Sequence, residues 1–302
     1  MAQSIRIGTR GSPLALAQAG MVRDALMARW PGVAEIVTIR TSGDRIQDRP
    51  LSDAGGKGLF TKEIEEALLA GSIDLAVHSA KDMPTLLPEG LMLAACLPRE
   101  DVRDAFISRN AKSLRDLPHG AVVGTASLRR QAMVKRLRPD VSTTVLRGNV
   151  ETRLRKLEGG EVDATLLALA GLKRLGLADK ATALLDAEEF LPAVGQGTIT
   201  IEARHDDAAT RALLAKIDHA DTSTALACER AFLAVLDGSC RTPIAGHAVL
   251  NGDAISFRGI ILRPDGSEAY ETSRTGNRSD AVALGADAGA ELKRRAPADF
   301  FA

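Results

Sequence analysis

The chain has 302 residues, enough for two or three domains with sizeable cores, and 45% of them are hydrophobic. Its 39 Lys and Arg residues balance 39 Asp and Glu residues, so the molecule as a whole attracts neither nucleic acid nor an anionic membrane surface. Aromatic residues make up only 3% of the chain, which argues against base-stacking platforms for single-stranded nucleic acid.

The N-terminal residues lack the charged-then-apolar pattern of a signal peptide, and no apolar run approaches the roughly 18 residues that span a bilayer. We therefore expect a cytoplasmic protein with no membrane partner and no nucleic-acid partner. The cysteines Cys96, Cys228 and Cys240 show neither metal-ligand spacing nor the density of a disulfide framework, so no metal site is expected. Net neutrality and the lack of a long apolar stripe favour a monomer.

The first predicted elements are a strand at residues 5–8 and a helix at residues 14–29. Ser12 as N-cap and Pro13 at the first helical position mark the start of the helix. The strand, the Gly-containing turn and the helix place backbone N–H groups and Arg10 at a helix N-terminus. Such a terminus suits an anionic ligand.

A segment rich in Gly, Asp, Arg and Pro follows at residues 42–57, and we expect a mobile loop. Its end contains the run Gly55, Gly56, Lys57 and Gly58. This run is not a phosphate loop, because Gly rather than Ser or Thr follows the Lys and the glycine spacing is wrong. A flexible lid is predicted instead.

The stretch from residue 73 to residue 84 begins as an apolar strand, of the kind that is covered on both faces in a parallel sheet, and ends as a polar loop. Lys81 and Asp82 lie in that loop, where ligands bind in open α/β folds. They are a candidate acid–base or electrostatic pair, although the pattern alone is equally consistent with a solvated loop. His78 and Ser79 do not form a catalytic pair, because neighbours on an extended strand point to opposite faces.

Two pairs of similar sequence segments indicate that the topology of the first part of the chain is repeated. Residues 122–127 resemble residues 7–12, with a strand, a Gly-Thr pair and a Ser before a helix. Residues 160–166 resemble residues 71–77 in the same order along the chain. We therefore predict two domains of one topology.

Two segments are candidates for the connections between these domains. Residues 98–101 are charged and turn-like, and residues 191–197 are rich in Gly and Pro. The second connector leads into a predicted strand at residues 198–203, which would return the chain to the first domain. Two such crossings form a double hinge, which permits domain closure over a ligand.

The most basic region lies between residues 124 and 158, where nine cations minus three anions leave an excess of six. Arg129 and Arg130 are expected in the first turn of a helix, Arg147 at a strand end, and Arg153 one turn into the next helix. Arg is suited to bidentate recognition of carboxylate or phosphate. Any single arginine here is as consistent with a solvated face, but three junctions together favour a polyanionic small molecule.

The last part of the chain has a different character. We expect a helix at 222–236, antiparallel strands at 247–250, 256–262 and 268–273, and a closing helix that ends near residue 295. Cys96 and Cys228 have apolar neighbours and are predicted core residues. Cys240 follows Gly and Ser in a polar loop, where Arg241 favours its thiolate, although an incidental exposed thiol fits the pattern equally well.

The combined motifs resemble those of the porphobilinogen deaminase (hydroxymethylbilane synthase) family, in family order and over nearly the whole chain. They are AVHSAKDMP at 76–84, GTASLRRQ at 124–131, LRGN at 146–149, GLKRLG at 171–176, PAVGQG at 192–197 and GSC at 238–240. The resemblance implies two periplasmic-binding-protein-like (type II) α/β domains joined by a double hinge, plus a C-terminal α+β domain with a small antiparallel sheet. The expected domains are residues 1–97 with 198–217, residues 102–192, and residues 220–302.

The resemblance also implies an activity. The enzyme would condense four porphobilinogen molecules head to tail, with loss of ammonia, onto a covalently bound dipyrromethane primer. It would then release hydroxymethylbilane by hydrolysis, a step of haem biosynthesis. Cys240 matches the position that carries the dipyrromethane cofactor through a thioether, and Asp82 matches the catalytic carboxylate.

The remaining site residues are carried over by position. Those implied to bind the cofactor are Lys81, Asp82, Thr125, Ser127, Arg129, Arg130 and Arg147. Those implied to bind the substrate are Arg10, Ser12, Arg147, Arg153 and Arg174. The alternative from another functional class is a non-catalytic two-domain binding protein or sensor for a polycarboxylate, which would give Cys240 no role.

Overall fold

The computed structural model describes residues 4–45, 60–236 and 242–301. The chain divides into two compact units, the first formed by residues up to Glu100 together with Gly197–Thr224, and the second by Asp101–Gln196 together with the residues from Ala225 on. The chain therefore passes between the units at residues 100–101, 196–197 and 224–225. The first two passages lie in the connectors predicted from the sequence.

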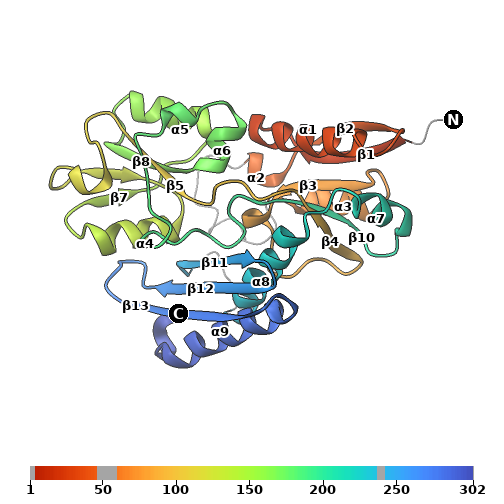
Figure 1. Ribbon diagram of the computed structural model, residues 1–302. Coiled ribbons are helices and arrows are strands. Elements are labelled where there is room, and N and C mark those ends of the chain that lie inside the picture. The colour runs from red at the N-terminus through yellow and green to blue at the C-terminus, as the bar shows by residue number, and fades with distance from the viewer. Residues whose placement is uncertain (1–3, 46–59, 237–241, 302) are drawn as a thin grey trace. The chain divides into compact units, whose positions relative to one another are not determined.

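The first unit is built on a five-stranded sheet with the order β2-β1-β3-β10-β4 (Figure 1). Its strands are β1 (Ser4–Arg10), β2 (Val33–Ile39), β3 (Leu75–Ser79), β4 (Leu91–Cys96) and β10 (Ile199–Arg204). β1 is parallel to β2 and β3, whereas β10 is antiparallel to β3 and β4. The sheet is thus mixed, and β3 has one parallel and one antiparallel neighbour rather than the all-parallel setting expected for residues 73–77.

Helices cover both faces of this sheet. They are α1 (Pro13–Met27), α2 (Ser42–Arg45), α3 (Lys62–Leu69) and α7 (Ala208–Leu214), with the short 3-10 helix η2 (Ala80–Asp82) after β3. Val77 of β3 packs into the core that contains Val22 and Leu26 of α1. Ala76 faces the other way and packs with Ile64 of α3. This alternation places successive residues of β3 in two different environments.

The second unit contains a sheet with the equivalent order β7-β6-β8-β5-β9. Its strands are β5 (Asp104–Ser108), β6 (Val122–Gly124), β7 (Ser142–Thr144), β8 (Ala164–Ala168) and β9 (Ala183–Leu184). β6 is parallel to β7 and β8, and β5 is antiparallel to β8 and β9. In both sheets the antiparallel strand is the one that follows a passage of the chain between units, so the predicted repeat and the type II α/β fold class are confirmed.

The helices of this sheet are α4 (Leu128–Leu137), α5 (Val150–Glu158) and α6 (Leu169–Arg174), with the 3-10 turns η3 (Leu114–Asp116) and η4 (Ala178–Lys180). Helix α8 (Ala220–Val235) starts in the first unit and continues into the second. It is followed by an antiparallel meander of three strands, β11 (Ile244–Asn251), β12 (Ala254–Leu262) and β13 (Ala269–Asn277). The chain then forms η5 (Arg278–Asp280), α9 (Ala281–Arg295) and η6 (Ala298–Phe301). This meander is the small antiparallel sheet expected near the C-terminus.

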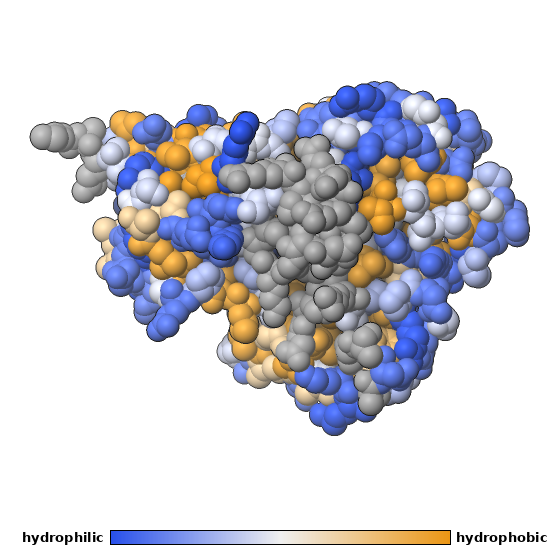
Figure 2. All heavy atoms as spheres, turned by 180° about the vertical axis from the view of Figure 1, so that it is seen from behind, coloured by the Kyte–Doolittle hydropathy of each residue, from blue (hydrophilic) through white to orange (hydrophobic). Residues whose placement is uncertain are grey.

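The second unit has a continuous core. Phe106 of β5 and Val123 of β6 belong to one hydrophobic cluster with Ile260 and Leu262 of β12. The division of this unit into two separate domains, at residues 102–192 and 220–302, therefore stays a prediction. On the face shown in Figure 2, apolar and hydrophilic residues are interspersed, as the balanced composition leads one to expect. Within the described residues, no helix is long and apolar enough to cross a membrane.

Candidate functional site

Asp82 ends the short turn η2, immediately beyond strand β3. The turn is tied to the sheet, because the N–H of Ala80 donates to the carbonyl of Thr198 at 3.0 Å and the N–H of Met83 donates to the carbonyl of Ala80 at 3.2 Å. Met83 is buried, whereas Lys81 and Asp82 are exposed. Within the described residues, the Asp82 carboxylate forms no ion pair. The fold thus presents an available carboxylate on an anchored turn.

Arg10 and Ser12 lie at the end of β1 and the start of α1 in the same unit. Ser12 is the N-cap of α1, as predicted, and its hydroxyl accepts a hydrogen bond from the N–H of Ala15 at 3.3 Å. Pro13 occupies the first helical position. The Arg10 guanidinium lies 4.2 Å from the centre of the Phe60 ring, in a cation–π contact.

Thr125 and Ser127 occupy the corresponding junction of the second unit, between β6 and α4. Ser127 caps α4 by accepting a hydrogen bond from the N–H of Arg130 at 3.4 Å, and its own N–H donates to the Thr125 hydroxyl at 3.2 Å. Gln131 donates its amide to the Thr125 carbonyl at 2.9 Å. This junction is rigid, and a helix N-terminus of this kind favours negative charge.

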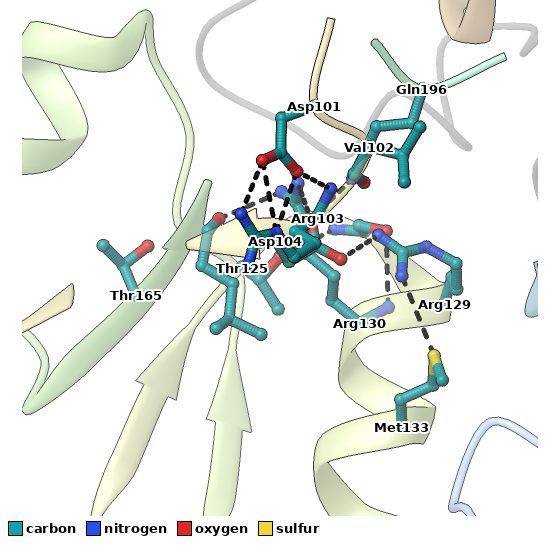
Figure 3. A network of polar contacts seen from close by, with 12 residues as sticks. Asp101, Val102, Arg103, Asp104, Thr125, Arg129, Arg130, Met133, Thr165 and Gln196 are labelled. Carbon is teal, nitrogen blue, oxygen red and sulfur yellow. Dashed lines mark hydrogen bonds and ion pairs between the residues drawn. The ribbon is translucent and has the colours of Figure 1, made fainter. Parts of the chain in front are cut away.

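Arg129 and Arg130 both turn toward one carboxylate, that of Asp104 at the start of β5 (Figure 3). Arg129 Nη2 lies 2.7 Å from Asp104 Oδ2, and Arg130 Nη2 lies 2.7 Å from Asp104 Oδ1. The Gln196 amide donates to the same Oδ1 at 3.0 Å and to the carbonyl of Val102 at 2.7 Å. The second connector is thereby tied to the start of β5.

The Asp104 network is buried, since Asp104 has an exposed fraction of 0% and both arginines 5%. Burial alone would raise the pKa of Asp104, but the charges of Arg129 and Arg130 outweigh it and hold that pKa well below its usual range. Two guanidinium groups against one carboxylate leave a net charge of plus one at the start of α4. The Nε atom of Arg129 is buried without a hydrogen-bond partner among the described residues.

The other predicted arginines of this unit are Arg147, Arg153 and Arg174. Arg147 is half-buried, and its Nε has no hydrogen-bond partner in the described part of the chain. Arg153 donates from Nε to the carbonyl of Gly148 at 2.9 Å, within the turn capped by Asn149. Arg174 ends α6 and is also half-buried. Arg147 and Arg153 follow β7, as expected, whereas Arg174 lies at the far end of the helix that follows β8.

Some predicted residues cannot be placed. Cys240 and the predicted lid residues Gly55, Gly56, Lys57 and Gly58 lie outside the described residues. Cys96 and Cys228 are described, and both are buried core residues as predicted; burial raises the pKa of the Cys228 thiol to about 12.

Two polar residues of the structure were missed by sequence reasoning. Asp104 and Glu202 are each fully buried, and each has apolar neighbours within its strand. A charged residue within an apolar strand run is the only sequence signal that could have singled them out, and it does not identify their partners.

Two family models match the chain. The model described as porphobilinogen deaminase, dipyromethane cofactor binding domain, matches residues 5–212, and the model of the porphobilinogen deaminase C-terminal domain matches residues 223–294.

Similar curated proteins carry the same family name. Porphobilinogen deaminases of Nitrobacter hamburgensis and Nitrobacter winogradskyi are each 68% identical over 299 residues, which cover 98% of this chain and 94% of each relative. Among solved structures, the immunogenic lipoprotein A of Vibrio vulnificus matches with a TM-score of 0.47 and 13% identity, over 73% of this chain and 97% of that one. A lipoprotein of the YaeC family from Enterococcus faecalis matches with a TM-score of 0.42 and 13% identity, over 71% and 90%.

Proposed function

Because this chain belongs to the porphobilinogen deaminase family, its reaction is that of the family, and we propose which of its residues carry out the chemistry. The enzyme condenses four porphobilinogen molecules head to tail, with loss of ammonia, and releases hydroxymethylbilane by hydrolysis. Its dipyrromethane cofactor supplies, when bound, the pyrrole carbon from which the product grows. The observation that carries this conclusion is the 68% identity over 98% of the chain, together with the exposed Asp82 carboxylate.

The described residues fit a cofactor of this chemistry. Each pyrrole carries an acetate and a propionate, so its ligands must be cations and hydrogen-bond donors. The α4 junction has a net charge of plus one after Asp104 is paired, and Arg147 has a buried Nε without a partner among the described residues. We propose that Lys81, Thr125, Ser127, Arg129, Arg130 and Arg147 hold the cofactor carboxylates.

Asp82 is proposed as the catalytic carboxylate. The loss of ammonia from porphobilinogen leaves a cationic methylene-pyrrole, and an anion held beside it lowers the energy of that charge. The same carboxylate accepts hydrogen bonds from pyrrole N–H groups and can move a proton between reacting atoms. The anchored turn η2 would hold it in place while successive substrates react.

The substrate carboxylates are assigned to a second set of cations. We propose that Arg10, Ser12, Arg147, Arg153 and Arg174 bind the acetate and propionate groups of porphobilinogen and of the growing product. Arg and a capped helix N-terminus together recognise a carboxylate by charge and by direction.

Several further assignments go beyond the described residues. We propose that Cys240 bonds the cofactor through a thioether and that Gly55, Gly56, Lys57 and Gly58 belong to a lid over the site. We also propose that the enzyme is a cytoplasmic monomer whose only partner is its small-molecule substrate. The net charge of zero and the scarcity of aromatics support the absence of a nucleic-acid partner.

The role of Asp82 is tested by Asp82→Asn, which keeps the shape of the side chain and removes its charge. Loss of a positioned acid–base group should lower kcat by about 100-fold or more while the free energy of unfolding stays nearly unchanged, since Asp82 is exposed. Glu89→Gln, at another exposed carboxylate of the same unit, is the matched control and should keep normal turnover. Near-normal turnover of the Asp82 variant would exclude the assigned role.

The covalent anchor is tested by intact-mass measurement of the purified protein and of Cys240→Ser. The unaltered chain should carry additional mass equal to two substrate-derived pyrrole units, and the variant should carry none. An unmodified mass for the native protein, or the same adduct on the variant, would contradict the attachment at Cys240. The non-catalytic binding protein considered as the alternative is not favoured, because the similar curated proteins are deaminases over 98% of the chain.

A further inference from the structure

Three titratable side chains are buried together in the first unit, behind the strand that leads to Asp82. His78 of β3, Glu202 of β10 and Glu65 of α3 have exposed fractions of 6%, 0% and 7%. His78 Nε2 lies 3.2 Å from Glu202 Oε2. None of the three has a role in the chemistry proposed above.

The charges of this cluster must nearly cancel, because burying an uncompensated charge is unfavourable. A protonated His78 and two ionised glutamates would leave a net charge of minus one. Oε1 of Glu65 and Oε1 of Glu202 are both buried without a hydrogen-bond partner among the described residues. One additional proton on a carboxylate both neutralises the cluster and supplies a donor where acceptors lack one.

We propose that Glu65, His78 and Glu202 form a neutral cluster of one imidazolium, one carboxylate and one carboxylic acid, which positions the Asp82 turn. Burial, reinforced by the nearby Glu202, raises the pKa of Glu65, so Glu65 is the residue that keeps its proton. The inference rests on the assignment of Asp82 proposed above.

The neighbouring charged groups do not replace this proton. Glu66, on the same helix, has a side chain that is 63% exposed. Arg204, two residues along β10, lies 2.7 Å from Asp207 and 3.8 Å from Asp74. On β4, burial raises the pKa of the Cys96 thiol, which therefore stays neutral. The three clustered side chains must balance their charges among themselves.

The connection to Asp82 runs through the pairing of β3 with β10. In the antiparallel register, His78 lies opposite Thr200 and Ser79 lies opposite Ile199. The contact between His78 and Glu202 thus links the two strands diagonally, close to the point where η2 begins. Because Asp82 follows His78 by four residues, a shift of β3 against β10 would displace the Asp82 carboxylate. His78 and Glu202 are positioning residues, since they act through this turn.

The first experiment observes the protonation of His78 directly and does not depend on enzyme turnover. The imidazole nitrogens of His78 are followed by 15N NMR in the unaltered protein and in Glu202→Gln. At about pH 7.5 the unaltered protein should show an imidazolium, and the variant should show a neutral ring, because its counter-ion is gone. A neutral ring in the unaltered protein would overturn the proposed charge distribution, whatever the outcome for Asp82.

The second experiment measures kcat and KM between about pH 6 and about pH 9 for His78→Asn alone and combined with Glu202→Gln. The single variant leaves Glu202 as an unpaired buried charge, and kcat should fall about tenfold near pH 8 with KM changed less than about twofold. The double variant has no buried charge and should recover kcat to within about threefold of the unaltered enzyme.

Conservative variants complete the test. Glu65→Gln resembles the protonated acid and should keep kcat within about twofold, and Glu66→Gln, on the exposed face of the same helix, is the control. A loss in His78→Asn with no recovery in the double variant would mean that these residues only pack. A His78→Asn enzyme with normal kcat would also overturn the positioning role. Failure of the proposed function itself would appear separately, as normal turnover of Asp82→Asn.

Discussion

At the scale of single residues, Asp104 shows how one buried carboxylate organises a functional region. Its two oxygens accept hydrogen bonds from Arg129, Arg130 and Gln196, which belong to α4 and to the second connector. The two arginines are therefore held before any ligand binds. Their orientation is preset, so binding a carboxylate at this junction needs little further ordering of side chains.

Asp104→Asn should strongly destabilise the protein, because it leaves two buried guanidinium groups without a counter-ion. Breaking a buried ion pair from one side costs about 3–5 kcal/mol, and urea unfolding should show a loss of this order. Asp101→Asn is the matched control: Asp101 pairs with Arg103, whose side chain is 42% exposed, and such a pair contributes about 1 kcal/mol or less. Equal losses in the two variants would contradict the dominant role of Asp104.

The pH dependence of this difference has a defined sign. The folded-state pKa of Asp104 lies below that of the unfolded chain, so its stabilising contribution is present above the unfolded value of about 4. The contribution is lost as the pH falls through the folded-state pKa. The difference in unfolding free energy between the unaltered protein and Asp104→Asn should therefore be constant between about pH 5 and pH 7 and narrow in more acidic solution. A difference that widened on acidification would have the wrong sign.

At the scale of elements, close packing of α9 against α8 depends on two glycines of α9, Gly285 and Gly289, and Gly285 makes the closer approach. A Cβ atom added to Gly285 would lie 2.0 Å from the carbonyl oxygen of Cys228 and 3.2 Å from the backbone nitrogen of Phe232. These are backbone atoms of a buried helix, which cannot move aside as the end of a long side chain can. The two helices would have to separate to accept any larger residue.

Gly285→Ala should consequently destabilise the protein by about 1–3 kcal/mol in urea unfolding, as overpacking does. Gly20→Ala, in the interior of α1, is the control, because nothing lies within 4 Å of its added Cβ. That variant should be stabilising by about 0.5–1 kcal/mol through helix propensity alone. Stabilisation by both substitutions would show that α8 and α9 can separate freely.

At the scale of the whole molecule, the balance of charge is the property that a ligand would change. The chain alone has a formal net charge of zero and an isoelectric point near 7.0. A covalently bound dipyrromethane adds an acetate and a propionate for each of its two pyrroles. The proposed cofactor therefore makes the molecule acidic without altering any of its residues.

Isoelectric focusing under denaturing conditions should separate the two forms. The unaltered enzyme should focus below the Cys240→Ser variant, because carboxylates with pKa values near 4 are ionised at neutral pH and the variant carries none of the added ones. An ammonia-release assay on the same two proteins before denaturation identifies the active form. Identical isoelectric points would show that the charged group is absent or is held elsewhere than on Cys240.

Much of the local structure could be predicted from the sequence, since it depends on residues close together in the chain. Ser12 and Ser127 were expected immediately before helices, and both cap their helices. The two pairs of similar sequence segments correctly predicted two sheets of one topology. By contrast, β5 was not predicted, because its five residues lack a distinctive period and its pairing partners are β8 and β9, far along the chain.

The sequence by itself determined which residue types lie at each strand end, and with them the family and the reaction. Only the tertiary structure decided which charged side chains contact one another. Arg129 and Arg130 were predicted to bind an anionic small molecule, yet they share the carboxylate of Asp104. For His78 the sequence excluded a catalytic pair with Ser79 but gave no sign of its partner Glu202. Glu202 is 124 residues away from His78 in the chain. Such pairs form because folding brings distant strands into register and removes water from between them. A local pattern of residues therefore cannot predict which distant side chains form a pair.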